Sequence, residues 1–169
     1  MTTTTTLEPA FGTRNSLPTE DRAQIIELLN RRLADALDLQ SQCKQAHWNV
    51  KGPHFIALHK LFDDVYADVT EYADLIAERI VQLGGVAFGT VRDVAENSEL
   101  DEYPTNISAG EDHVKNLSAA LAAFGSRMRI AIAETGELDD DASADICTEI
   151  TRGADKWLWF IEAHTQAGR

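Results

Sequence analysis

Apolar residues recur at helical spacing through most of the chain. Between residues 19 and 49 they stand three and four positions apart, which marks one face of a long helix that ends at Gly52-Pro53. A second pattern of this kind runs from about residue 55 to residue 83 and stops at Gly84-Gly85. No stretch alternates convincingly between apolar and polar residues, so the pattern predicts helices and no sheet.

The second half of the chain predicts two more long helices after a long connection. Residues 86–107 hold a short helical candidate near residues 90–98, and a connection of this length favours a crossover along a bundle. Ser108 and Glu111 form a capping-box pattern that opens a third long helix, which Gly136 interrupts. The last helix starts near Asp141. Four long helices with one long crossover predict an all-α, ferritin-like four-helix bundle whose crossover carries a short helix.

The bundle is expected to occupy residues 19–166, with residues 1–18 as a flexible N-terminal arm. The arm begins with a run of threonines and offers little to bury, so we expect it to be extended or disordered. A chain of 169 residues is long enough for one domain with a sizeable core.

The net charge of −13 excludes a protein that holds nucleic acid by its body, because phosphate contacts need clustered lysine and arginine. Such a charge suits attraction of cations, or solubility alone. No apolar run approaches the length of a membrane span and the N-terminus lacks a signal pattern, so we expect no membrane partner and a cytoplasmic location. Cys43 and Cys147 lie far apart in a chain without an export signal and do not predict a disulfide.

Five side chains that could bind a metal ion stand within about thirty residues of one another. They are His47, His59, Asp63, Asp74 and Glu78. Imidazole and carboxylate together suit iron, manganese or zinc. On the helix of residues 55–83, the last four ligands face away from the apolar side. A charged row is usually a solvated face, but like charges four residues apart, as at Asp74 and Glu78, repel unless a cation lies between them.

The ligand candidates on this helix form two pairs that cannot meet within one chain. His59 and Asp63 are four residues apart, and Asp74 follows His59 by 15 residues, which is about 22 Å along a helix. A single centre therefore requires helices from two subunits. His47 lies on the apolar stripe of the first helix, where a core histidine and a metal ligand are about equally expected.

Other features narrow the ligand set. Cys43 lies one turn before His47 and is expected in the core, because a thiolate matches an iron oxidation site poorly. His54, His113 and His164 have no partner at ligand spacing and are expected to be structural or surface residues. The chain contains no Glu-x-x-His motif, which disfavours a di-iron site inside one bundle.

The motif from His47 to Phe55, followed by Leu58–Asp63, Asp74, the Ala77–Ile80 segment and Leu83-Gly84-Gly85, closely resembles the Dps family, the mini-ferritins. Residues 155–162 also look like the last helix of that family, and the resemblance covers about residues 19–165. It implies a hollow homododecamer with a ferroxidase centre at its two-fold interface. Such a centre oxidises Fe(II), preferentially with hydrogen peroxide rather than oxygen, and the Fe(III) is stored in the cavity. Iron storage and protection from oxidative stress would follow.

The resemblance also implies roles for individual residues. On the family pattern, His47, Asp74 and Glu78 come from one subunit, while His59 and Asp63 come from the other. Trp48 would shield the centre. Zinc or manganese at the same site, in a shell that acts as a metal buffer, remains an alternative, since the ligands suit several metals.

Acidic residues cluster around the start of the last helix. The helix dipole accounts for Asp140 or Asp141 but not for Asp141, Asp145 and Glu149, where like charges stack four residues apart. In the family this region lines the three-fold pores through which iron enters. The resemblance therefore implies that Asp141, Asp145, Glu149 and Glu137 form a funnel of one charge sign that concentrates cations.

DNA binding is where the chain departs from the family name. Members that bind DNA commonly use lysine-rich arms, whereas the first 18 residues here contain no lysine and only Arg14 as a basic residue. We expect weak or absent DNA binding at physiological salt. The alternative function is a DNA-compacting nucleoid protein with incidental iron binding.

Overall fold

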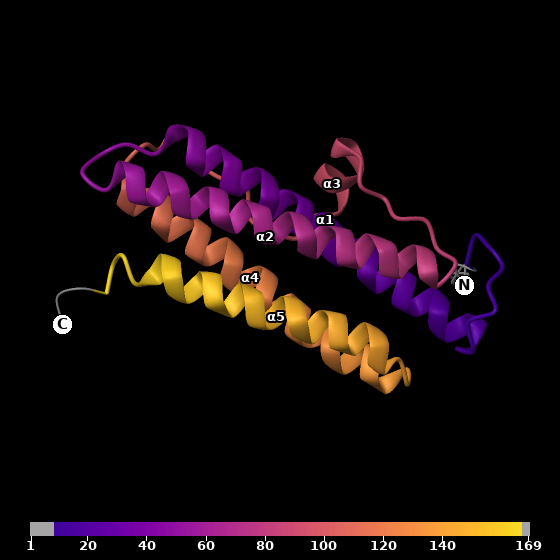
Figure 1. Ribbon diagram of the computed structural model, residues 1–169. Helices are drawn as coiled ribbons and strands as arrows, with labels where there is room; N and C mark the ends of the chain where they lie inside the picture. The colour runs from indigo at the N-terminus through magenta and orange to yellow at the C-terminus, as the bar shows by residue number, and fades with distance from the viewer. Residues whose placement is uncertain (1–8, 167–169) are drawn as a thin grey trace, which may run out of the picture.

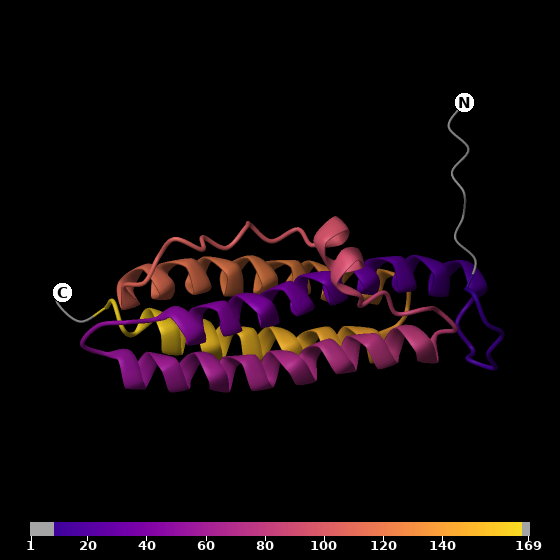
Figure 2. The ribbon, with the colours of Figure 1, turned by 90° about the horizontal axis from the view of Figure 1, so that it is seen from above.

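The computed structural model describes residues 9–166, which form five helices and no strand (Figure 1). The four long helices lie side by side, and the crossover that carries the short helix runs along the bundle (Figure 2). The predicted all-α bundle with a crossover helix is confirmed. The helices are α1 Thr19–Asn49, α2 Phe55–Gln82, α3 Val91–Asn97, α4 Gly110–Glu137 and α5 Asp141–Glu162.

Helix α2 shows why the sequence packs in this way. Its inward positions Phe62, Val65, Val69, Ile76 and Ile80 are fully buried in a core shared by all four long helices. These residues recur at helical spacing, so one face of α2 is removed from water while the opposite face remains exposed. No helix within residues 9–166 is long and apolar enough to cross a membrane.

The start of α4 differs from the prediction. Its N-cap is Ala109, which makes no side-chain cap, so the capping box expected from Ser108 is wrong. The Ser108 carbonyl accepts a hydrogen bond of 2.8 Å from the Lys51 amide, within a bridge between Lys51 and Ala109 that keeps this backbone extended. Gly136 lies inside α4, which ends one residue later.

Residues 9–18, which belong to the predicted N-terminal arm, contact the bundle. The Phe11 amide donates to the Gly84 carbonyl at 2.9 Å, and Leu17 packs against the core. Gly84 has a φ of +89°, and a Cβ there would lie 2.5 Å from the Phe11 oxygen, so this approach requires glycine. The remaining part of the predicted arm, residues 1–8 with the threonine run, lies outside the described residues.

Candidate metal centre

His47 and His59 face each other across the turn between α1 and α2. Their ring centroids are 3.7 Å apart and the ring planes differ by 20°. Nδ1 of His47 lies 2.7 Å from the His59 carbonyl, and Nδ1 of His59 lies 2.8 Å from the His47 carbonyl. A carbonyl can only accept, so each Nδ1 carries the ring proton and each Nε2 keeps a lone pair. A backbone bond that fixes the tautomer in this way is typical of metal-binding histidines.

Asp63 lies one turn after His59 and completes this group. Its Oδ1 is 4.0 Å from Nδ1 of His47 and forms an ion pair with the Lys44 ammonium. The hydrogen bond from Lys44 lowers the pKa of Asp63 below its usual value. About half of the Asp63 side chain is exposed, while that of His47 is 13% exposed. We call His47, His59 and Asp63 the histidine half-site.

Asp74 and Glu78 form the second group, which we call the carboxylate half-site. Both are exposed on the outer face of α2, and they follow His59 by about 22 Å and about 28 Å along the helix. Within residues 9–166 neither forms an ion pair. Asp74 borders a hollow of about 380 Å³ between α1, α2 and the segment after α2.

The position of His47 in the structure differs from the predicted grouping of the ligands. His47 was expected to join Asp74 and Glu78, but it lies against His59 in its own chain. Helices α1 and α2 run in opposite directions from a common turn, so residues at similar distances from Gly52 face each other. That symmetry was readable from the sequence, where His47 and His59 lie five and seven residues from Gly52. Within residues 9–166 no three ligand-type side chains are placed to hold a metal ion in one chain.

The remaining candidates are distributed as follows. Trp48 is 68% exposed, so its shielding role stays a prediction that needs a partner surface. Cys43 is fully buried as expected, and burial raises its thiol pKa to about 12. His113 is buried with Nδ1 2.7 Å from the Tyr103 hydroxyl, and His54 and His164 are exposed.

The acidic cluster divides into exposed and buried members. Glu137, Asp141, Asp145 and Glu149 are exposed, and the last three occupy one face of α5. Asp140 is instead 3% exposed. Its carboxylate accepts two hydrogen bonds from Arg79, at 2.8 and 3.0 Å, and caps α5 through the Ser143 amide.

Asp140 is therefore a structural residue, and sequence reasoning missed its partner Arg79. Burial raises the pKa of Asp140, but the hydrogen bonds from Ser143 and Arg79 together outweigh it, and the net pKa is lowered. Arg79 lies 61 residues earlier in the chain, so no local pattern reveals the pairing.

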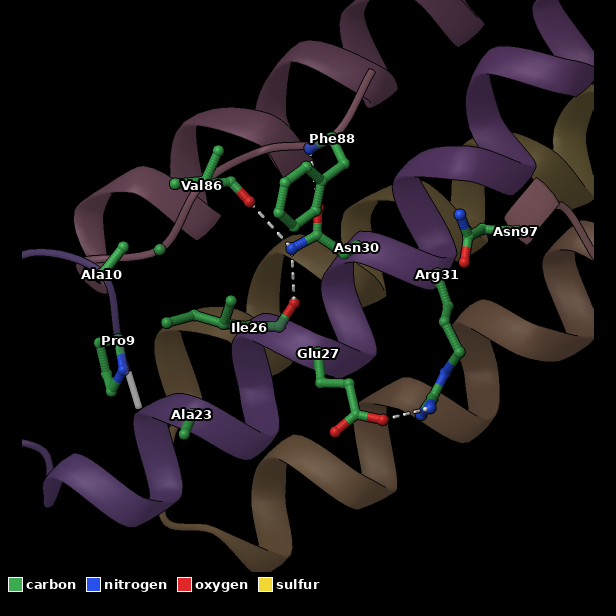
Figure 3. Close-up of a pocket in the computed structure, with 11 residues that line it drawn as sticks. Pro9, Ala10, Ala23, Ile26, Glu27, Asn30, Arg31, Val86, Phe88 and Asn97 are labelled. Atoms are coloured by element: carbon green, nitrogen blue, oxygen red, sulfur yellow. Dashed lines mark hydrogen bonds and ion pairs between the residues drawn. The ribbon is translucent and has the colours of Figure 1, made fainter. Parts of the chain in front are cut away.

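A mostly apolar hollow of about 390 Å³ lies between residues 9–10, α1 and the segment after α2 (Figure 3). Asn30 spans it by donating to the Val86 carbonyl and accepting from the Phe88 amide, while Glu27 pairs with Arg31 at 3.1 Å. None of the predicted ligands lines it.

Comparisons with known proteins agree with this fold. A family model described as a ferritin-like domain matches residues 26–169. The DNA protection during starvation protein of Agrobacterium fabrum is 43% identical over 154 residues, covering 91% of this chain and 95% of the relative. Among solved structures, DpsA14 from Streptomyces coelicolor has a TM-score of 0.88 at 33% identity and covers 94% of both chains.

Dps from Microbacterium arborescens, solved in a high iron form, has a TM-score of 0.82 at 36% identity and covers 88% of this chain and 96% of that one. The predicted resemblance is confirmed. The chain belongs to the Dps family of ferritin-like proteins.

Proposed function

We propose that this protein oxidises Fe(II) at a centre completed between two subunits and stores the Fe(III) in the cavity of a homododecamer. Iron storage and protection from oxidative damage are supported by membership of the Dps family. The relative from Microbacterium arborescens, solved in a high iron form, also supports iron as the metal.

The observation that carries the proposal is that each half-site is incomplete. The histidine half-site supplies two imidazoles and Asp63, whereas the carboxylate half-site supplies two carboxylates with no nitrogen ligand. About 22 Å of helix separates them within a chain, so a second subunit must bring the missing half. A two-fold interface is self-complementary and would form two such centres at once.

The ligand mix suits oxidation of Fe(II) by peroxide. Carboxylates offset the added positive charge as Fe(II) becomes Fe(III), and the Nε2 lone pairs of His47 and His59 would hold the ferrous ion. Two Fe(II) ions each give one electron to hydrogen peroxide, whose O–O bond breaks to yield two hydroxide ions. Paired oxidation avoids hydroxyl radical, which is the reason to propose peroxide as the preferred oxidant over oxygen.

We propose that iron arrives along the exposed acidic face of α5. Asp141, Asp145 and Glu149, with Glu137 nearby, would concentrate cations if three copies met around a pore.

The test is stopped-flow oxidation of Fe(II) by assembled apo-protein, with peroxide and then with oxygen. The variant His59→Ala/Asp63→Ala is expected to oxidise iron slowly while remaining assembled, and the exposed His164→Ala serves as its control. Wild-type rates in the double variant would place the centre elsewhere.

Mixing subunits tests whether the centre is shared. Both His59→Ala/Asp63→Ala and Asp74→Ala/Glu78→Ala should oxidise iron slowly when each is assembled alone. After dissociation and random reassembly of equal amounts, about a quarter of the centres would combine two intact halves at a two-fold interface. Recovered activity near that level supports a shared centre, and no recovery, despite mixed assemblies seen by mass spectrometry, contradicts it.

DNA compaction is the second candidate function, and the name of the Agrobacterium fabrum relative favours it. The net charge of −13 opposes it. We propose weak or absent DNA binding, tested by gel shift over a range of salt concentrations. A strong shift at about 150 mM salt would favour the DNA role.

Zinc or manganese as the bound metal is tested by the stopped-flow Fe(II) oxidation assay with each ion added as competitor.

A further inference from the structure

Lys44 already occupies Oδ1 of Asp63, one of the two carboxylate oxygens that the histidine half-site offers to a metal. It lies on α1 three residues before His47, and its ammonium pairs with Oδ1 of Asp63. The same oxygen is 4.0 Å from Nδ1 of His47, so the ammonium stands at the edge of the half-site. Three quarters of the Lys44 side chain is removed from solvent, which distinguishes this contact from a fully exposed ion pair.

A second contact would hold the Lys44 ammonium after it leaves Asp63. The Lys44 nitrogen lies 4.4 Å from the ring centroid of Tyr66, which follows Asp63 by three residues on α2. An aromatic face attracts an ammonium ion but cannot bind a metal ion in the manner of a carboxylate. When the Lys44 ammonium leaves Asp63, the Tyr66 ring therefore still compensates part of its charge.

We propose that Lys44 is a built-in competitor for metal ions: iron reaches Oδ1 of Asp63, the oxygen nearer to His47, only by displacing the Lys44 ammonium, which moves onto Tyr66. This inference rests on the proposed function, because it takes Asp63 as a ligand. Lys44 acts through Asp63 and is a positioning residue that sets the affinity of the site.

The negative charge of the complete centre explains what the Lys44 ammonium contributes while no metal is bound. A shared centre brings Asp63 close to Asp74 and Glu78 of a second subunit, and three empty carboxylates would repel one another. Lys44 offsets part of this charge while the site is empty. It also weakens the binding of every incoming cation, so that the centre retains only ions whose charge exceeds that of an ammonium.

The experiment measures binding of Zn²⁺, which undergoes no redox reaction here, to assembled full-length apo-protein by titration calorimetry. Lys44→Met keeps the aliphatic stem and removes the charge, and we expect it to bind Zn²⁺ about three- to fivefold more tightly than wild type, the upper part of the range for a partly exposed ion pair. Lys44→Arg keeps the charge and should stay within about twofold of wild type. Lys60→Met is the matched control, because Lys60 is exposed beside His59 and makes no ion pair within residues 9–166.

Each outcome decides something. Unchanged or weaker Zn²⁺ binding in Lys44→Met overturns the competitor role, and so does equal tightening in Lys60→Met, which would indicate a general charge effect. Asp63→Asn separates this inference from the proposed function. If Asp63→Asn leaves Zn²⁺ binding of the otherwise wild-type protein unchanged, Asp63 is no ligand and the proposed centre itself fails.

Discussion

His47 and His59 each bond through Nδ1 to the backbone carbonyl of the other, at 2.7 and 2.8 Å. The exchange joins the end of α1 to the start of α2 and holds the two rings in contact. Neither ring can turn without breaking a bond to the opposite helix. The pair therefore presents both Nε2 atoms in fixed directions before any metal arrives, and this lowers the ordering cost of binding.

Replacement of one histidine should weaken the centre more than it weakens the fold. His47→Gln removes one nitrogen ligand and one side of the exchange, and we expect Zn²⁺ affinity and Fe(II) oxidation each to fall about 10- to 100-fold. Titration calorimetry and stopped-flow absorbance measure the two effects. His54→Gln, in the exposed turn, is the control and should behave as wild type. Equal behaviour of the two variants would exclude His47 as a ligand.

The Arg79–Asp140 pair should set part of the acid stability. Asp140→Asn leaves the buried Arg79 charge uncompensated, and we expect a loss of about 3 kcal/mol in the free energy of unfolding at neutral pH. The folded-state pKa of Asp140 is lowered, so its contribution is complete above the unfolded value of about 4 and is lost as pH falls through the folded value.

Urea denaturation of the wild type and Asp140→Asn at several pH values measures this dependence. The stability difference should be constant from neutral pH to about pH 5 and should shrink below about pH 4. Asp139→Asn is the neighbouring control, because Asp139 is exposed and its φ of 55° is tolerated by asparagine. A difference that persists at low pH would show that Asp140 acts through packing alone.

The helices could be predicted from the sequence because their apolar periodicity is long and strong. The bounds expected for α1, residues 19–49, agree with the structure, and the turn at Gly52-Pro53 is where the chain reverses. The start of α4 was predicted wrongly, since Ser108 forms a backbone bond with Lys51, 57 residues earlier in the chain. Local cap chemistry could not reveal that contact.

The candidate site also contains features that the sequence predicted and features that it did not. The outward direction of Asp74 and Glu78 follows from the helical period and agrees with their exposure. The placement of His47 against His59 follows from the reversal of the chain at Gly52-Pro53, a signal that the sequence interpretation did not use, whereas that of Asp140 depends on Arg79 from another helix. A charge in a sequence does not show whether it faces solvent or a buried partner.

The exposed acidic face of α5 should control how fast iron enters. Asp141→Asn/Asp145→Asn removes two charges from that face, and we expect Fe(II) oxidation at low salt to slow by about tenfold, because a funnel of one sign raises the local cation concentration. Zn²⁺ affinity at equilibrium should not change. Glu96→Gln on α3 is an exposed control. Equal rates in wild type and the double variant would exclude this route.

Gly153 on α5 should be a position where even the smallest substitution is costly. A Cβ there would lie 1.9 Å from the Tyr72 hydroxyl oxygen, so Gly153→Ala must push the buried Tyr72 ring out of its place, at a cost of about 1–3 kcal/mol in unfolding free energy. Gly125→Ala on α4 is the matched control, because its Cβ would meet its nearest neighbour at 3.6 Å, and alanine favours a helix interior by up to about 1 kcal/mol. Thermal melts of the two variants should therefore move in opposite directions, and Gly153→Ala/Tyr72→Phe should regain part of the loss. If Gly153→Ala melts at or above the wild-type temperature, Tyr72 does not pack against this glycine as described.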